Sequence, residues 1–142
     1  MAPPFVIWDL VLGIYVCVLT KMGDICMSKT FDLEERTFLF AKDVRIFLKD
    51  LAKTIANIED GRQLVRSSGS VGANYREANE ALSKKDFNMR IKISRKESKE
   101  STYWLRLIYE TNNWSTDLTI KALLNESQEL TKIFSSIYEK SK

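Results

Sequence analysis

The chain has 142 residues with a formal net charge of +3, and 44% of its residues are hydrophobic. This length suits one domain that can bury a substantial core. The sequence contains only five Gly and two Pro, so it is poor in turn signals, which favours long helices over many short strands. It contains no His, which removes the commonest general base and the commonest metal ligand.

The two cysteines, Cys17 and Cys26, both lie near the N-terminus. Two cysteines alone cannot build a zinc site or a disulfide framework. The rest of the chain has no Cys, which fits a reducing cytoplasm. We therefore expect a cytoplasmic protein without a metal or other cofactor, and we do not expect an enzyme or a small-molecule substrate.

The first 26 residues differ in character from the rest. Residues 5–19 are almost wholly apolar but include Asp9, and the run is shorter than the roughly 20 residues that a transmembrane helix needs. A secretory signal would carry basic residues before the apolar run and small residues at a cleavage site, and neither is present. Three interpretations stay open: a misplaced start with translation from Met27, a segment that packs or associates with a membrane, and a signal peptide. We expect residues 1–26 to be an extraneous or flexible segment and residues 27–142 to be the folded domain.

Two amphipathic helices are predicted in the first half of this domain. Asp32, followed three residues later by Glu35, is a capping pattern for a helix over residues 33–56. Its apolar stripe recurs at helical spacing and comprises Phe40, Val44, Phe47, Leu48, Leu51 and Ile55. Residues 57–61 are expected to break the helix before a second one over residues 62–82.

The second helix has a thin apolar line with small residues in its centre. Its inner positions are Leu64, Ser68, Val71, Tyr75, Ala78 and Leu82. Gly69 and Gly72 lie in mid-helix, where each Gly costs about 1 kcal/mol relative to Ala. We expect that cost to be tolerated because a neighbouring helix backbone comes close.

Two further helices are predicted in the second half. Ser83 with Asp86 is a capping box for a helix over residues 84–110. The inner line of that helix comprises Phe87, Ile91, Ser94, Ser98, Thr102, Leu105 and Ile108. A fourth helix is expected to start near residue 115 or 116 with Asp117 in its first turn. Its stripe comprises Ile120, Leu123, Leu124, Leu130, Ile133, Phe134, Ile137 and Tyr138.

Short connections between four long amphipathic helices favour an antiparallel up-down bundle. The predicted fold class is therefore all-α, an antiparallel up-down four-helix bundle in a single domain.

Polar residues on the second and third predicted helices suggest a buried network. Residues Arg66, Ser70, Asn74 and Glu77 fall four, four and three positions apart, so they share one helix face. Glu97 and Glu100 lie three apart on the third helix. If the two faces meet, Arg66 can form a bidentate ion pair with Glu100.

A polar active site and a register-fixing structural network both fit these residues. The lack of His and of a carboxylate cluster favours the structural role. We then expect Arg66→Ala and Glu100→Ala to destabilise or misassemble the protein.

Basic residues are concentrated in the first half of the third predicted helix. They are Lys84, Lys85, Arg90, Lys92, Arg95, Lys96 and Lys99. Against Asp86 and Glu97 they give this segment a net charge of +5, while the whole chain carries only +3. Charge gathered on one helix indicates a polyanionic partner, although a solvated outer face gives the same pattern. The sequence has no signature of a base-reading motif, so binding would use the nucleic-acid backbone.

Tyr103 and Trp104 are adjacent, so one of them must point away from the core side of a helix. Together with Leu107 and Trp114 they could form an apolar surface patch, and such patches often mark subunit contacts. Partial burial within one subunit is the alternative. We assign Tyr103, Trp104 and Leu107 to a candidate oligomer interface.

Two motifs together resemble a known family. The pattern Arg-Ser-x-x-Ser-x-x-x-Asn-x-x-Glu over residues 66–77 is followed by Lys-Glu-Ser-x-Glu-Ser-x-Tyr-Trp-Leu over residues 96–105. Together they resemble the bacterial four helix bundle proteins, also called the 23S ribosomal RNA intervening-sequence protein family. The resemblance covers about residues 31–138 and leaves residues 1–26 unexplained.

The resemblance implies an up-down four-helix bundle that assembles as a homopentamer. Members are encoded within intervening sequences of 23S ribosomal RNA genes and elsewhere in bacterial genomes. A related branch, the accessory variability determinant proteins of diversity-generating retroelements, forms a positively charged pentamer that binds nucleic acid and a reverse transcriptase. Residence in a ribosomal RNA gene does not by itself imply a ribosomal role.

We therefore expect a non-enzymatic homo-oligomer that binds RNA or DNA through the basic third helix. The rival hypothesis is a protein-interaction scaffold partnered with a protein encoded nearby, such as a toxin-like protein or a reverse transcriptase. A membrane-tethered bundle is the third alternative.

Overall fold

The computed structural model describes residues 7–9, 14–16, 32–113 and 117–142, and it divides into two units, Met1–Thr30 and Phe31–Lys142. In the first unit, strand β1 (Ile7–Asp9) pairs antiparallel with strand β2 (Ile14–Val16). Trp8 is the register partner of Tyr15. This strand pair was not predicted from the sequence. The proposed start at Met27 lies outside the described residues.

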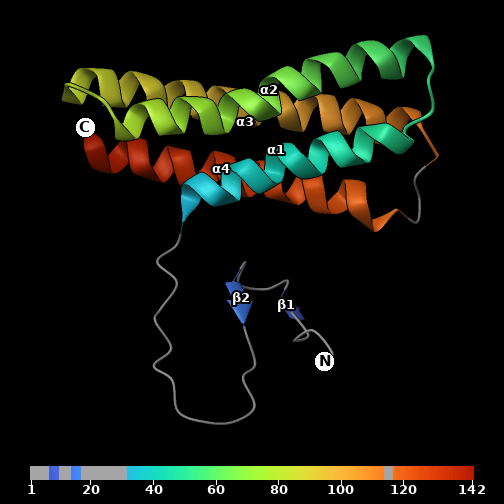
Figure 1. Ribbon diagram of the computed structural model, residues 1–142, viewed down its shortest axis with the longest axis horizontal. Helices are drawn as coiled ribbons and strands as arrows, with labels where there is room; N and C mark the ends of the chain where they lie inside the picture. The colour runs from blue at the N-terminus through green and yellow to red at the C-terminus, as the bar shows by residue number, and fades with distance from the viewer. Residues whose placement is uncertain (1–6, 10–13, 17–31, 114–116) are drawn as a thin grey trace. The chain divides into compact units, whose positions relative to one another are not determined.

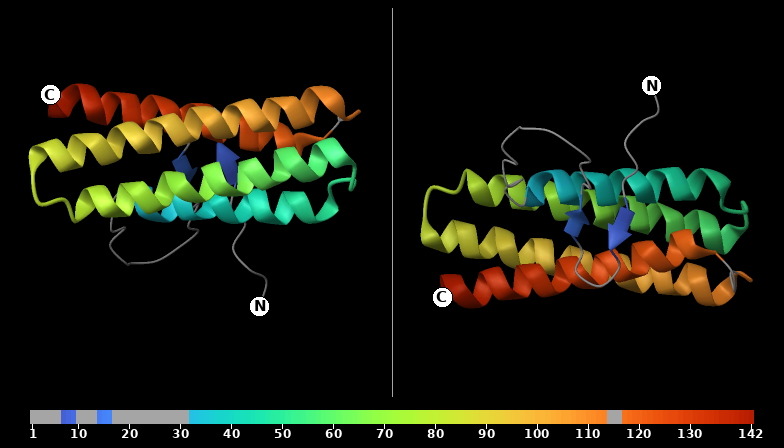
Figure 2. Two further views of the ribbon diagram at one scale, coloured as in Figure 1. Left: turned by 90° about the horizontal axis from the view of Figure 1, so that it is seen from above. Right: turned by 90° about the horizontal axis from the view of Figure 1, so that it is seen from below.

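The second unit contains four helices in chain order. They are α1 (Leu33–Asp50), α2 (Ile55–Asn79), α3 (Lys84–Thr111) and α4 (Leu118–Ser141). Each helix runs antiparallel to the one before it, and the four lie lengthwise beside one another (Figures 1 and 2). Helix α2 contacts α1 and α3, and α4 contacts α3 and α1. The predicted all-α, up-down four-helix bundle is therefore confirmed.

Side chains cap α1 and α3 where the sequence predicted. The Asp32 carboxylate accepts a hydrogen bond from the Glu35 backbone N–H (3.2 Å), and the Ser83 hydroxyl accepts one from Asp86 N–H (3.1 Å). The Asp117 carboxylate accepts from Thr119 N–H (2.7 Å). Asp117 is therefore the N-cap of α4 rather than a residue of its first turn. These acceptors satisfy amide groups that have no partner within the helix.

The predicted boundary between the first two helices was wrong. Helix α1 ends at Asp50 and α2 begins at Ile55, so residues 57–61 lie inside α2. Thr54 starts α2 because its hydroxyl accepts from the Asn57 backbone N–H (3.2 Å). Gly61, which we took as part of a break, leaves room for α1: a Cβ added there would lie 3.2 Å from Leu48 Cδ2.

These shifts expose two residues that were assigned to the apolar stripes. Ile55 opens α2 and is 87% exposed, and Leu82 lies after the end of α2 and is 99% exposed. The other positions of the four predicted stripes are buried or partly buried. The core consists of Leu33, Phe40, Val44, Phe47, Leu51, Leu64, Val71, Ala78, Ile91, Leu105, Ile108, Ile120, Leu123, Leu130 and Phe134.

The two mid-helix glycines of α2 both face α1, but the close backbone that was predicted lies only beside Gly72. A Cβ added at Gly72 would lie 2.9 Å from Thr37 Oγ1, 3.2 Å from Thr37 Cβ and 3.6 Å from the Thr37 backbone carbonyl carbon. At Gly69 the nearest atom would be a guanidinium nitrogen of Arg45, 3.1 Å away. Glycine therefore allows α1 and α2 to approach closely at Gly72, whereas a flexible side chain lies beside Gly69.

No helix in the part of the chain that the structure describes is long and apolar enough to cross a membrane.

Candidate nucleic-acid interface

Helix α3 differs from the other three helices in charge. It carries eight Lys or Arg and four Asp or Glu, a net charge of +4. In each of α1, α2 and α4 the basic and acidic residues are equal in number. The excess positive charge of the bundle therefore lies on one helix.

The structure divides the seven predicted basic residues into two groups. Arg90 is half-buried on the α2 side, where Nη1 donates to Asn74 Oδ1 (3.3 Å) and Nε lies 3.8 Å from Asp86 Oδ1. We call the other six the α3 basic surface: Lys84, Lys85, Lys92, Arg95, Lys96 and Lys99. Arg95 is half-buried and the five lysines are exposed.

Few acidic groups neutralise the α3 basic surface. Lys96 Nζ lies 3.9 Å from Glu97 Oε1, at the limit of an ion pair. None of the other five makes an ion pair with a residue that the structure describes. Lys92 and Arg95 instead lie over the ring of Tyr138 on α4, 4.7 and 5.4 Å from its centroid. The sequence pattern predicts Tyr138 in the apolar stripe of α4 and contains no signal of these contacts.

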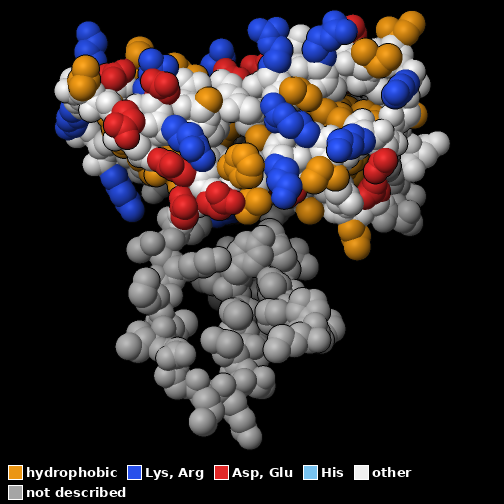
Figure 3. Space-filling view, viewed as in Figure 1, with side chains coloured by type: hydrophobic (Ala, Val, Ile, Leu, Met, Phe, Trp, Pro, Cys, Tyr) orange, Lys and Arg blue, Asp and Glu red, His pale blue; other side chains and the backbone are white. Residues whose placement is uncertain are grey.

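Charged side chains elsewhere on the bundle are mixed. On the face shown in Figure 3, Lys and Arg side chains lie among acidic and hydrophobic ones. Exposed hydrophobic residues on this unit include Phe38 and Ile46 of α1, which are 52% and 47% exposed.

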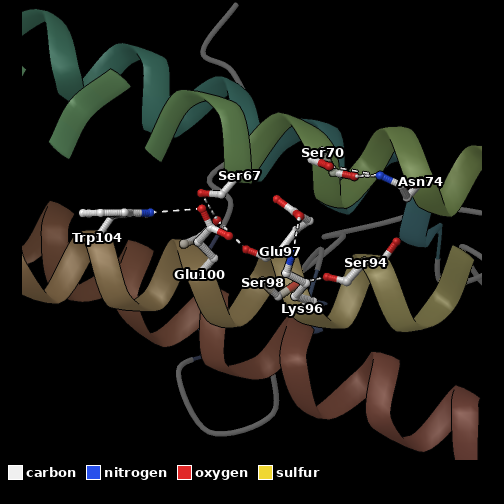
Figure 4. A network of polar contacts seen from close by, with 10 residues as sticks. Ser67, Ser70, Asn74, Ser94, Lys96, Glu97, Ser98, Glu100 and Trp104 are labelled. Carbon is white, nitrogen blue, oxygen red and sulfur yellow. Dashed lines mark hydrogen bonds and ion pairs between the residues drawn. The ribbon is translucent and has the colours of Figure 1, made fainter. Parts of the chain in front are cut away.

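Serine residues connect the buried sides of α2 and α3 (Figure 4). The Ser94 hydroxyl donates to the backbone carbonyl of Val71 (3.0 Å), and the hydroxyls of Ser101 and Ser67 are hydrogen-bonded at 2.8 Å. Both bonds are buried. Because these side chains are small, the two helices come close enough for direct hydrogen bonds between them.

The predicted network is only partly present. Asn74 Nδ2 donates to Ser70 Oγ (3.0 Å) and to the Ser70 carbonyl (2.9 Å). Arg66, however, is exposed and makes no ion pair with Glu100. A guanidinium group is costly to remove from water, so Arg66 stays outside while the serines fill the contact. Glu77 is also exposed, at the solvent side of α2.

Glu97 lies in this region with its side chain only 16% exposed. Burial raises its pKa above the ordinary value of 4.5, and the nearby Glu100 carboxylate raises it further. The charges of Lys96 and Arg66 act in the opposite direction on this pKa. Arg66 is therefore an electrostatic neighbour of Glu97 rather than the ion-pair partner of Glu100.

Two polar contacts between helices were missed in the sequence. Asn57 and Asn112 exchange side-chain hydrogen bonds of 2.9 and 3.0 Å, which join the start of α2 to the end of α3. Arg36 of α1 forms a two-pronged ion pair with Glu126 of α4, at 2.6 and 3.0 Å. Both pairs are far apart in sequence, and no local pattern indicates such partners.

The predicted aromatic patch lies on the outer side of α3. Tyr103 is 57% exposed, and Trp104 and Leu107 are half-buried. The rings of Tyr103 and Trp104 pack edge to face with centroids 4.9 Å apart, and the indole N–H donates to Glu100 (3.3 Å). Trp114 lies outside the described residues.

Two other features concern the described part of the chain, its acidic and sulfur side chains and a surface hollow. No three His, Cys, Asp or Glu side chains gather there in a way that could hold a metal ion. A hollow that is open to solvent lies at the α2–α3 turn, lined in part by Ala78, Leu82 and Phe87.

Comparison with known proteins identifies the family. The family model described as 23S rRNA-intervening sequence protein matches residues 29–136. The chain belongs to this family. The match leaves out most of the N-terminal unit, as the resemblance in the sequence had done.

A solved structure supports the fold at the level of the whole bundle. A crystal structure of a protein of unknown function from the S23 ribosomal protein family of Bacteroides thetaiotaomicron is 30% identical in sequence. The likeness covers 74% of this chain and 96% of that chain, with a TM-score of 0.64. No curated protein matches the sequence. The comparisons therefore give the family and the fold but no biochemical activity.

Proposed function

We propose that the protein is a non-enzymatic, cytoplasmic homo-oligomer that binds RNA or DNA through the α3 basic surface. The observation that carries this proposal is the charge of α3, which is +4 while the other helices are neutral. Five of its cations also lack an ion-pair partner among the described residues. Cations without such partners are free to contact phosphates.

The proposed binding uses the phosphate backbone. Each Lys or Arg that neutralises a phosphate releases a condensed counterion, so the affinity falls steeply as salt concentration rises. Such contacts orient a protein on nucleic acid but carry no base sequence. We therefore expect the protein to prefer nucleic acids by shape and charge.

The test compares the protein with a variant in which Lys84, Lys85, Lys92, Arg95 and Lys99 are changed to Gln. Binding to a labelled structured RNA and to a DNA duplex is measured over a salt series. We expect the unchanged protein to bind with a steep salt slope, and the variant to lose about ten-fold or more in affinity with a shallower slope.

A matched control carries the same change in net charge on other parts of the bundle. In it Lys42, Lys49, Lys53, Arg62 and Arg76, all exposed, are changed to Gln. We expect this control to keep most of the affinity. Equal losses in both variants would show that net charge alone is responsible, and absence of binding near physiological salt would reject the proposal.

Self-association would increase the positive charge that one particle presents. The family resemblance implies five copies, and the exposed Tyr103 with the half-buried Trp104 and Leu107 offers an apolar contact. Light scattering gives the copy number directly. We expect Tyr103→Lys to lower the mass toward that of one chain while the helical content is unchanged. A variant that keeps the full mass would exclude Tyr103 from the interface.

A protein-interaction scaffold without nucleic-acid binding is the alternative. The observation in its favour is the pair of exposed hydrophobic residues, Phe38 and Ile46, on the outer side of α1. Its partner would be a protein encoded nearby, such as a reverse transcriptase. Co-purification with the product of a neighbouring gene, lost when Phe38 and Ile46 are changed to Lys, would favour this alternative.

A further inference from the structure

Three cations surround one aromatic ring where α3 and the end of α4 lie side by side. Lys92 Nζ, Lys142 Nζ and Arg95 Cζ lie 4.7, 5.2 and 5.4 Å from the centroid of Tyr138. Tyr138 is half-buried and packs against the core. Lys142 also pairs with Glu139 (2.8 Å). We call these four residues, Tyr138, Lys92, Arg95 and Lys142, the Tyr138 cluster.

The electrostatic surroundings of the ring are strongly positive. A hydrogen bond with Lys92 and the charges of Lys92 and Lys142 lower the pKa of the Tyr138 phenol, while burial and the charge of Glu139 oppose them. Arg95 adds a third positive charge over the ring. Such an excess of positive charge attracts a phosphate group.

A nucleic-acid base can displace the cations from the face of the Tyr138 ring. A cation–ring contact at an exposed site is weak. A nucleic-acid base stacked on an aromatic side chain gains more than one such contact. The cations that the base displaces would bind the neighbouring phosphates, which offsets the loss of their contacts with the ring.

We propose that the Tyr138 cluster binds an unpaired nucleotide, with the base on the ring and the adjoining phosphates on Lys92, Arg95 and Lys142. This inference rests on the proposed function and names the class of nucleic acid, which is single-stranded. Duplex bases are stacked on one another and cannot reach the ring. The Tyr138 cluster thus gives a preference for single strands that the lysines alone would not give.

The test uses the full chain with fluorescent oligomers of U and of dT, each about 15 nucleotides long, a length within the usual site size of single-strand binding proteins. A duplex of similar length is the reference. We expect Tyr138→Leu to lower single-strand affinity roughly five-fold or more and to leave duplex affinity nearly unchanged. Tyr138→Phe keeps the ring and should retain the affinity. Comparison of the U and dT oligomers separates RNA from DNA as the preferred source of the nucleotide.

Controls separate stacking from charge and from unfolding. Phe38→Leu removes an exposed ring from α1 and should bind as the unchanged protein does. Lys92→Gln with Arg95→Gln should weaken single-strand and duplex binding together. If Tyr138→Leu is unfolded by circular dichroism, photocrosslinking of the unchanged protein to halogenated-uracil strands replaces it, and the crosslink is expected at Tyr138.

Three results would overturn the inference. Equal single-strand affinity of folded Tyr138→Leu and the unchanged protein would reject stacking on Tyr138, and the proposed function would survive if the five-residue variant still lost binding. A crosslink confined to other residues would have the same meaning. If the unchanged protein binds none of the oligomers, the proposed function and the inference both fail.

Discussion

Single residues decide how closely the helices of this bundle approach one another. Thr37 is fully buried, and its hydroxyl bonds to the carbonyls of Leu33 and Glu34 within α1 (both 2.9 Å). Gly72 of α2 lies directly against it. Thr37 lies between Gly72 and the backbone of its own helix, to which its hydroxyl is hydrogen-bonded. It therefore cannot make room for a larger residue at position 72 unless α1 moves.

We therefore predict that Gly72→Ala destabilises the protein by about 1–3 kcal/mol, the usual effect of overpacking a core. Gly69→Ala is the matched control, because its new methyl group would meet the end of the flexible Arg45 side chain. That substitution should be neutral or should stabilise by up to about 1 kcal/mol through helix propensity. Urea unfolding measures both variants, and an equal effect at the two sites would contradict this account.

The Glu97 carboxyl gives a second prediction at the residue scale. Its raised pKa means that the folded protein holds the proton more tightly than the unfolded chain. The stability gained by protonation is present below pH 4.5, the ordinary pKa, and is lost as the pH rises through the higher folded-state pKa. The Gln side chain of the Glu97→Gln variant cannot ionise, so this variant should not lose stability as the pH rises.

We expect Glu97→Gln to be more stable than the unchanged protein at about pH 7 and similar to it near pH 4. Thermal unfolding across this range provides the measurement. Glu110→Gln, at an exposed carboxylate that pairs with Arg106, is the control and should show little pH-dependent gain. A Glu97→Gln variant that is less stable at neutral pH would show that its charge is favourable.

At the scale of the elements, α2 and α3 form a contact built from small polar side chains. Ser67 and Ser101 are both buried, and their hydroxyls are 2.8 Å apart. The net contribution of such a hydrogen bond to the free energy of unfolding is about 1 kcal/mol. Removal of one hydroxyl also leaves the other hydroxyl buried with fewer hydrogen-bond partners. The energetic effects of the two serines should therefore be coupled.

We predict that Ser67→Ala and Ser101→Ala each destabilise the protein by about 1 kcal/mol. The double variant should lose less than the sum of the two, because the bond is broken only once. A double-mutant cycle from urea unfolding measures the difference. Strict additivity would show that the two hydroxyls bond mainly to their own backbones.

Helices α1 and α4 close the bundle, and the ion pair between Arg36 and Glu126 joins them. The side chains of Arg36 and Glu126 are 22% and 17% exposed and bond through two nitrogens and two oxygens. This two-pronged geometry is stronger than an ordinary surface pair.

We expect Arg36→Met and Glu126→Gln each to destabilise the bundle, with a coupling energy of about 1 kcal/mol in a double-mutant cycle. Hydrogen exchange should be faster in α1, because α1 loses one of its contacts with α4. The exposed pair Arg62–Glu59 is the control and should show almost no coupling.

At the scale of the whole molecule, the net positive charge is gathered on one of four helices. The like charges of the α3 basic surface repel one another in the folded state, and salt screens this repulsion. Charge on α3 therefore opposes folding slightly, whereas the charges of the other helices balance.

We predict that an α3 variant with Lys84, Lys85 and Lys99 changed to Gln, which keeps the cations over Tyr138, melts at a higher temperature than the unchanged protein at low salt. The difference should shrink as salt is added, because screening removes the repulsion. The Gln variant of the matched control positions should show no comparable gain. Melting curves at several salt concentrations decide this, and a lower melting temperature for the α3 variant would mean that its cations have stabilising partners.

The sequence alone determined the helices, most of the core and the family. Apolar residues at helical spacing, the caps Asp32 and Ser83, and the charge of α3 are local patterns, and local patterns follow from helix geometry. The boundary between α1 and α2 was predicted wrongly because the cap is a single Thr. Many Thr residues cap no helix, so Thr54 alone does not mark the start of α2.

Only the tertiary structure decided which polar groups meet. Arg66 proved to be exposed, whereas Ser67 and Ser101 formed the buried contact that had been expected of Arg66 and Glu100. Lys92 and Arg95 of α3 lie over the ring of Tyr138 of α4. Such contacts join residues far apart in sequence, and their geometry depends on the rotation and separation of packed helices, which no local pattern specifies.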